Sequence, residues 1–168
     1  MHDGQTRPQT GGPFADHPLV VAELVEGAGA DECVIAAAHL HDAVEKTGLT
    51  ADEVSIACGD DVAALVVTLT EDPSIDGYRE RKRDLRRRVI DAGRPATLLY
   101  AADRVANLRD WTSIDPSRRD EVGSALGTSF QERIDLWRED LVELTSADPD
   151  LPLLTEIEIE LRRLSKAS

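Results

Sequence analysis

The sequence predicts an all-α fold, a single-domain helical bundle, and three observations support this prediction. Hydrophobic residues make up 41% of the 168 residues, but aromatic residues only 4%. The core must therefore be built from Ala, Val, Leu and Ile, a composition that favours helix packing over sheet packing. The segments between the expected helices are short, and the chain length is that of one domain. We therefore expect residues 1–168 to form one domain.

The expected helices follow from end signals along the chain. Residues 1–16 are polar and rich in Gly and Pro, which predicts a loop. Pro18 suits the first turn of a helix, and Asp31 is a typical N-cap. Thr50 and Glu53 have the spacing of a capping box. The predicted helices cover 18 to 27 or 29, 32–48, 50–58, 61–69, 78–91, 95–110, 115–127, 128–145 and 151–164, with a loop at 70–77.

Charge and composition exclude several classes of protein. The net charge of −14 argues against general nucleic-acid binding, because a polyanion would be repelled. Cys33 and Cys58 form no C-x-x-C pair, so neither a disulfide scaffold nor a zinc ribbon is expected. No apolar run approaches the roughly 18 residues of a membrane span, and no leader sequence is visible. We therefore expect a cytoplasmic protein without a membrane partner.

Polar side chains interrupt the Ala-rich run AAAHLHDAVEKTG at 36–48. Burying a charge costs several kcal/mol unless it is paired or bound to a metal. His41 and Asp42 point about 100° apart on a helix, so both reach one ion only at the rim of a cleft. Glu45 lies one turn beyond His41, and we expect both to face inward. By itself the pair is a weak signal, because a buried His is more often a hydrogen-bonded core residue.

A second acidic group stands in the apolar run TLLYAADRVANL. Asp103 shares a helix face with Leu99, Ala106 and Asn107, and an aspartate on such a face needs a partner. One alternative is a salt bridge to Arg104 or another Arg, although Arg104 is about 100° away round the helix and is expected to point elsewhere. Asn107, one turn along, can donate to a carboxylate or to a bound oxyanion.

Metal binding is suggested by a set of four residues rather than by any one of them. His17 stands at the junction between loop and helix, where an exposed cap residue is the simpler interpretation. Together with His41, Asp42 and Asp103 it supplies two imidazoles and two carboxylates. Such a mixed set suits Mn²⁺, Fe²⁺, Zn²⁺ or Ni²⁺. On a six-coordinate ion it would leave positions for water and substrate.

Three motifs resemble one family when they are taken together. HPLVVAELVEGAGADECVIAAAHLHDAVEKTGLT is similar to the start of an HD-superfamily metal-dependent phosphohydrolase, most of all the stand-alone (small alarmone) hydrolases of the RelA/SpoT group. YAADRVANLRD resembles that group's ADRLxNxRD segment, and GQTRPQTGGPFADHP resembles its opening GQxRxxGxPYxxHP. The resemblance covers residues 2 to about 112. It implies an HD-type bundle with a metal-site core at 17–112 and packing helices at 113–168.

The resemblance also implies roles for individual residues. It implies metal ligands, usually for Mn²⁺, at His17, His41, Asp42 and Asp103. It implies that Glu45 works with metal-activated water. It implies contacts to a phosphorylated nucleotide substrate at Arg7, Asn107, Arg81 and Lys82. Arg81 and Lys82 belong to the basic segment RERKRDLRRR, which can instead be a solvated face paired with the surplus carboxylates.

One position departs from the family pattern HDxxED, because Lys46 replaces its second acidic residue. A lysine does not accept a proton as an anion does, but it can contact a phosphate, so we assign Lys46 to the catalytic site with Glu45.

Three hypotheses for the function stay open: hydrolysis of guanosine 3′,5′-bis(diphosphate) (ppGpp) at its 3′-pyrophosphate, phosphatase action on a nucleoside monophosphate or NADPH, and a catalytically silent domain that binds a nucleotide or a partner. Trp111 and Trp137 are expected to pack the helices or to form a homodimer contact.

Overall fold

The computed structural model describes residues 16–166, and all regular secondary structure in that part of the chain is helical. This confirms the all-α prediction. The helices are α1 (Asp16–Gly27), α2 (Glu32–Leu40), α3 (Ala43–Thr47), α4 (Ala51–Cys58), α5 (Asp60–Leu69), α6 (Tyr78–Ala92), α7 (Arg94–Ser113), η1 (Pro116–Arg118), α8 (Arg119–Ala125), α9 (Phe130–Ala147) and α10 (Leu154–Lys166). Arg7 and most of the loop predicted at 1–16 lie outside the described residues.

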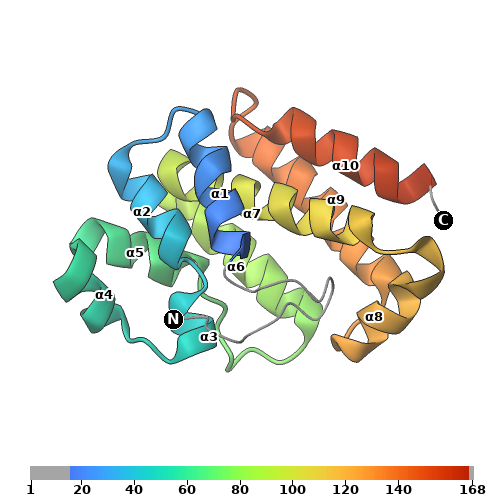
Figure 1. The fold of residues 1–168 in the computed structure, drawn as a ribbon, viewed down its shortest axis with the longest axis horizontal. Helices are drawn as coiled ribbons and strands as arrows, with labels where there is room; N and C mark the ends of the chain where they lie inside the picture. Colours follow the sequence, from blue (N-terminus) through green and yellow to red (C-terminus); the bar gives the residue numbers. More distant parts are fainter. Residues whose placement is uncertain (1–15, 167–168) are drawn as a thin grey trace.

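Helix α7 forms the centre of the bundle. It contacts α1, α2, α5, α6, α9 and α10, and most of its residues are buried. Figure 1 shows α7 in the middle of the molecule, with α4 and α5 near one end and α8 near the other. The small side chains of Ala96, Ala101 and Ala102 are fully buried, so neighbouring helices can approach the α7 backbone closely. A polar group in the middle of α7, such as Asp103, is therefore surrounded by protein.

The predicted helix ends are confirmed where a local signal decides them. Asp31 caps α2 by accepting a hydrogen bond from the Val34 backbone N–H at 3.0 Å. Thr50 and Glu53 form the predicted capping box at the start of α4. Gly48 ends α3 with a φ of 76°, a left-handed conformation that glycine adopts without steric cost.

The helix predicted at 32–48 is wrong as a continuous element. The structure ends α2 at Leu40 and begins α3 at Ala43, with His41 and Asp42 in a turn between them. His41 Nδ1 donates a hydrogen bond to the Ala38 carbonyl oxygen, which is one of the four terminal carbonyl groups of α2 without a partner in the helix. The prediction failed because the Ala-rich pattern continues through the turn, whereas this side-chain contact is not visible in a periodicity.

Of the C-terminal helices, α9 and α10 pack against α7, and α8 packs against α9. Trp111 and Trp137 are buried and meet edge to face, with ring centroids 6.0 Å apart, so they serve packing within the chain. The helix predicted at 115–127 is divided into η1 and α8, and the last helix begins at Leu154 instead of residue 151. The division into a 17–112 core and 113–168 packing helices stays a prediction. None of the described helices combines the length and apolarity needed to cross a bilayer.

Candidate metal centre

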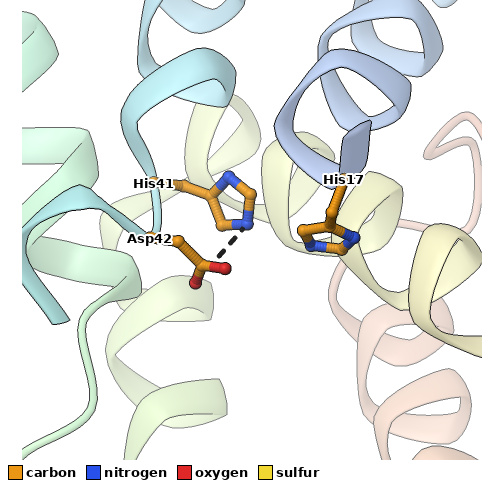
Figure 2. Close-up of side chains that lie close together, drawn as sticks. All are labelled: His17, His41 and Asp42. Atoms are coloured by element: carbon orange, nitrogen blue, oxygen red, sulfur yellow. Dashed lines mark ion pairs between the residues drawn. The ribbon is translucent and has the colours of Figure 1, made fainter. Parts of the chain in front are cut away.

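Three separate segments bring the four predicted ligands together. His17 lies in the first turn of α1, His41 and Asp42 in the turn after α2, and Asp103 in the middle of α7. His17, His41 and Asp42 each offer a ligand atom, and these atoms lie within 4.8 Å of one another. Figure 2 shows the two imidazoles and the Asp42 carboxylate around a common space. Asp103 Oδ1 lies 3.0 Å from His17 Nε2 and 3.7 Å from His41 Nε2.

His17 is not the exposed cap residue that its position in the sequence favours. Helix α1 begins at Asp16, which places His17 inside the first turn, and its exposed fraction is 4%. Its ring centroid is 5.2 Å from that of His41. The packing of α1 against both α2 and α7 therefore turns a residue at a helix start into an inner member of the cluster.

The hydrogen bonding of His41 prepares it for a cation. Its Nδ1 lies 2.8 Å from the Ala38 carbonyl oxygen, and because a carbonyl only accepts, Nδ1 carries the proton of the neutral ring. Nε2 then presents a lone pair. It is buried, has no hydrogen-bond partner, and lies 3.7 Å from both Asp42 Oδ1 and Asp103 Oδ1. A metal ligand whose other nitrogen is held by a carbonyl is the usual arrangement for His in metal sites.

The spacing of the donor atoms also fits one divalent ion. Bonds from such an ion to N and O donors are about 2.1 Å long, so neighbouring donors lie about 3.0 Å apart at right angles and about 3.4 Å apart in a tetrahedron. The separations of 3.0 and 3.7 Å around Asp103 Oδ1 are close to this range. His17, His41 and Asp42 therefore fit a mixed imidazole and carboxylate site, and Asp103 lies beside both of its imidazoles.

Charge within the cluster decides which groups carry protons. Burial lowers the pKa of His41, but the nearby carboxylates of Asp103 and Asp42 outweigh it and raise this pKa to about 9. Burial alone would raise the pKa of Asp103, yet Arg104 and the two histidines hold it well below its usual value. Without a cation, Asp103 is thus ionised and His41 protonated, and a divalent ion takes the place of that proton.

Arg104 was predicted to point elsewhere, and this prediction is wrong. Its Nη2 donates to Asp103 Oδ2 at 2.9 Å. The guanidinium lies over the Tyr100 ring, 4.5 Å from the centroid, so a long side chain curls back toward its neighbour. Asn107 Nδ2 donates to Asp103 Oδ1 at 2.7 Å, which agrees with the predicted donation to a carboxylate. The substrate contact of Asn107 stays a prediction.

Glu45 does not face inward with His41 as predicted. His41 is buried, whereas Glu45 lies on the solvent side of the short helix α3. The Glu45 side chain is 32% exposed and forms an ion pair with Lys46. Burial lowers the pKa of Lys46, but Glu45, Asp42 and Glu71 outweigh it and raise this pKa, so Lys46 is a cation beside the cluster.

The basic side chains of helix α6 form ion pairs with carboxylates. This is one of the two interpretations that the sequence left open. Arg81 Nε lies 3.2 Å from Glu71 Oε2, and Lys82 Nζ donates to the other oxygen of the same carboxylate. Sequence reasoning missed Glu71, because its position in a loop gives no hint of a shared partner. The proposed contacts of Arg81 and Lys82 with a substrate stay predictions.

A family model described as HD domain matches residues 1–131 of this chain. Guanosine-3′,5′-bis(diphosphate) 3′-pyrophosphohydrolase MESH1 from Xenopus tropicalis is 37% identical over 106 residues, which are 62% of this chain and 59% of that protein. A probable guanosine-3′,5′-bis(diphosphate) 3′-pyrophosphohydrolase from Synechocystis is 27% identical over 142 residues, 80% of this chain and 19% of that protein. The chain thus spans less than two thirds of the length of these relatives.

Two solved structures have the same architecture. The crystal structure of lmo0812 from Listeria monocytogenes EGD-e has a TM-score of 0.77 and 27% sequence identity, and the match covers 89% of this chain and 99% of that one. The structure of a metazoan ortholog of SpoT that hydrolyzes ppGpp has a TM-score of 0.71 and 25% identity, and the match covers 98% of this chain and 87% of that one.

Proposed function

We infer the function of this chain from its family, because it belongs to the HD domain family. We propose that it is a divalent-metal-dependent phosphohydrolase that acts on guanosine 3′,5′-bis(diphosphate). The reaction would release pyrophosphate from the 3′ position and leave guanosine 5′-diphosphate. The observation that carries this proposal is the convergence of His17, His41, Asp42 and Asp103 from three segments. The names of the MESH1 relatives and of the ppGpp-hydrolysing structural neighbour support the choice of substrate.

Each residue of the site has a proposed task. His17, His41, Asp42 and Asp103 would hold the ion, for which we propose Mn²⁺. A bound divalent ion supplies Lewis acidity, which activates water and withdraws charge from a phosphoryl oxygen. Glu45, beside the cluster and open to solvent, would accept the proton of the attacking water.

Binding of a polyanionic substrate requires local positive charge, since the whole chain carries −14. Lys46, Arg81 and Lys82 would provide this charge. Asn107 donates to Asp103 and would offer its amide to a phosphate oxygen as charge develops. Arg7 is assigned to the same task from the sequence. For the protein as a whole, we propose a cytoplasmic location and a homodimer.

A second candidate, binding of a nucleotide without hydrolysis, is favoured by one observation. Lys46 replaces an acidic residue of the family pattern and forms an ion pair with Glu45, the proposed proton acceptor. The ion pair occupies a carboxylate oxygen that would otherwise be free to take the proton of the attacking water. Phosphatase action on another nucleotide, such as NADPH or a nucleoside monophosphate, needs the same metal centre and differs only in the substrate.

These candidates are separated by one set of assays on the full chain. Binding of Mn²⁺ is measured by calorimetry, and release of pyrophosphate or phosphate is then measured with guanosine 3′,5′-bis(diphosphate), NADPH and nucleoside monophosphates. We expect pyrophosphate from the first compound, and its loss in His41→Ala. Nucleotide binding without any product would support the second candidate. Failure of the wild-type chain to bind Mn²⁺ would contradict the metal-dependent proposal.

A further inference from the structure

Four buried charged side chains form a continuous network from α6 and α9 to α7. Arg86 Nη1 donates to Asp140 Oδ1 at 2.6 Å, and Asp140 Oδ2 lies 3.8 Å from Arg104 Nε. Arg104 Nη2 in turn donates to Asp103 Oδ2 at 2.9 Å. The exposed fractions are 1% for Arg86, 2% for Asp140, 6% for Arg104 and 8% for Asp103. Because desolvation offsets much of the attraction in buried ion pairs, stability alone is a poor explanation for such a network.

The two oxygens of Asp103 have different partners. Oδ1 faces the cluster, where it lies 3.0 Å from His17 Nε2 and accepts a hydrogen bond from Asn107 at 2.7 Å. Oδ2 is held by Arg104 on the opposite side. This restrains rotation of the carboxylate, so that one defined oxygen is presented to a cation. Arg104 has the Tyr100 ring against its face and forms an ion pair with Asp140, whose Oδ2 lies 3.8 Å from Nε without a hydrogen bond.

We infer that Arg104 and Asp140 are positioning residues of the metal centre, which act through Asp103 and do not bind the ion themselves. The inference rests on the proposed function, since it concerns the affinity of that same centre for a divalent cation. Asp140 lies on α9, beyond residues 1–131 that match the HD domain model. Helix α9, which the sequence predicted only to pack, thus takes part in preparing the metal site.

The charges in the network give the direction of the expected effects. Asp140→Asn removes the anion that pairs with Arg104, so the guanidinium is held less firmly and in turn holds Asp103 less firmly, whereas Arg86 keeps its contacts with other carboxylates. Arg104→Lys keeps the charge, but a single ammonium group does not hold Asp103 and Asp140 as the planar fork does. Changes to groups that hold a metal ligand weaken metal binding by about 10- to 100-fold, and we expect about tenfold for each variant.

The test is a calorimetric Mn²⁺ titration of the wild-type chain and of the Asp140→Asn, Arg104→Lys and double variants. The control for Asp140→Asn is Glu160→Gln, a buried carboxylate on α10 that lies 3.3 Å from Thr112 Oγ1 of α7. The control for Arg104→Lys is Arg119→Lys, because Arg119 is equally buried but belongs to α8. The shift in Tm on adding saturating Mn²⁺ is a second readout, which a general loss of packing does not change.

We expect about tenfold weaker binding in Asp140→Asn and Arg104→Lys, a smaller Mn²⁺-induced rise in Tm, and unchanged binding in both controls. The double variant should bind no more weakly than Arg104→Lys alone, because both residues act through one contact. Wild-type affinity in Asp140→Asn and Arg104→Lys, or additive losses in the double variant, would overturn the inference while the proposed function stands. If Asp140→Asn does not fold, the comparison of Arg104→Lys with Arg119→Lys decides. Absence of Mn²⁺ binding by the wild-type chain overturns both proposals.

Discussion

Replacement of Asp103 by Asn tests the electrostatics of the cluster separately from catalysis. The side chain keeps its shape, but one oxygen becomes an NH₂ group. If this group faces Arg104, it opposes the Nη2 donor that now lies 2.9 Å from Oδ2. If it faces the cluster, it opposes the Asn107 amide that now lies 2.7 Å from Oδ1. In the first orientation the buried Arg104 donor loses its acceptor, in the second the half-buried Asn107 amide does, and in both Arg104 loses a charge partner.

The expected loss of stability follows from these contacts. A buried donor left without an acceptor costs about 1–3 kcal/mol. Breaking a buried ion pair by removing one partner costs about 3–5 kcal/mol, and Asp140 still compensates part of the Arg104 charge. We therefore expect metal-free Asp103→Asn to be about 3 kcal/mol less stable, which corresponds to a Tm lower by about 6–12 °C for a chain of this size.

The assay is thermal unfolding in the presence of a chelator and again with Mn²⁺. With Mn²⁺ the gap between wild type and variant should widen, because the wild type gains ligand-linked stability and the variant gains less. Asp135→Asn is the matched control, since Asp135 pairs with Arg138 at the surface and should cost less than about 1 kcal/mol. A metal-free Asp103→Asn protein as stable as this control would refute the reasoning.

Three further predictions concern packing and pH. Gly123→Ala should destabilise the protein by about 1–3 kcal/mol in urea unfolding, because the added Cβ would lie 2.8 Å from the Phe130 backbone nitrogen; Gly27→Ala, with open space around it, should not. Leu99→Ala, at a fully buried position of α7, should cost about 2–5 kcal/mol in the same assay, and a cost below that would contradict the packing of the core. The pKa of His41 rises from 6.5 to about 9 on folding, so its stabilisation of the metal-free protein is complete below pH 6.5 and lost as pH rises through 9. Mn²⁺ affinity should increase over the same window, and a pH-independent affinity in calorimetry would show that no proton is displaced.

Local signals in the sequence were sufficient for much of the fold. Asp31, Thr50 and Glu53 act on backbone groups within three residues, so the helix starts that they mark need no tertiary information. The predicted cluster was recognised for a similar reason. An aspartate such as Asp103 within an apolar helical run is conspicuous whatever surrounds it, because a buried charge requires a partner.

The direction of side chains near the site depended on contacts that no periodicity contains. Glu45 was expected to face inward with His41, but its side chain is open to solvent and pairs with Lys46, whereas His41 is buried. Arg104 was expected to point away from Asp103, yet the Tyr100 ring and Asp140 bring its guanidinium back. The backbone angle between helix positions does not limit a long, flexible side chain.

The sequence by itself determined the helical class and the local helix ends, because these follow from composition and short spacings, and its resemblance to the HD superfamily predicted the four candidate ligands. Only the tertiary structure decided that His17 is buried, that Lys82 and Arg81 share Glu71, and that Asp140 reaches the centre through Arg104. The physical reason is that buried charges choose partners by proximity in space. That proximity is set by how the helices pack around α7, between residues far apart along the chain.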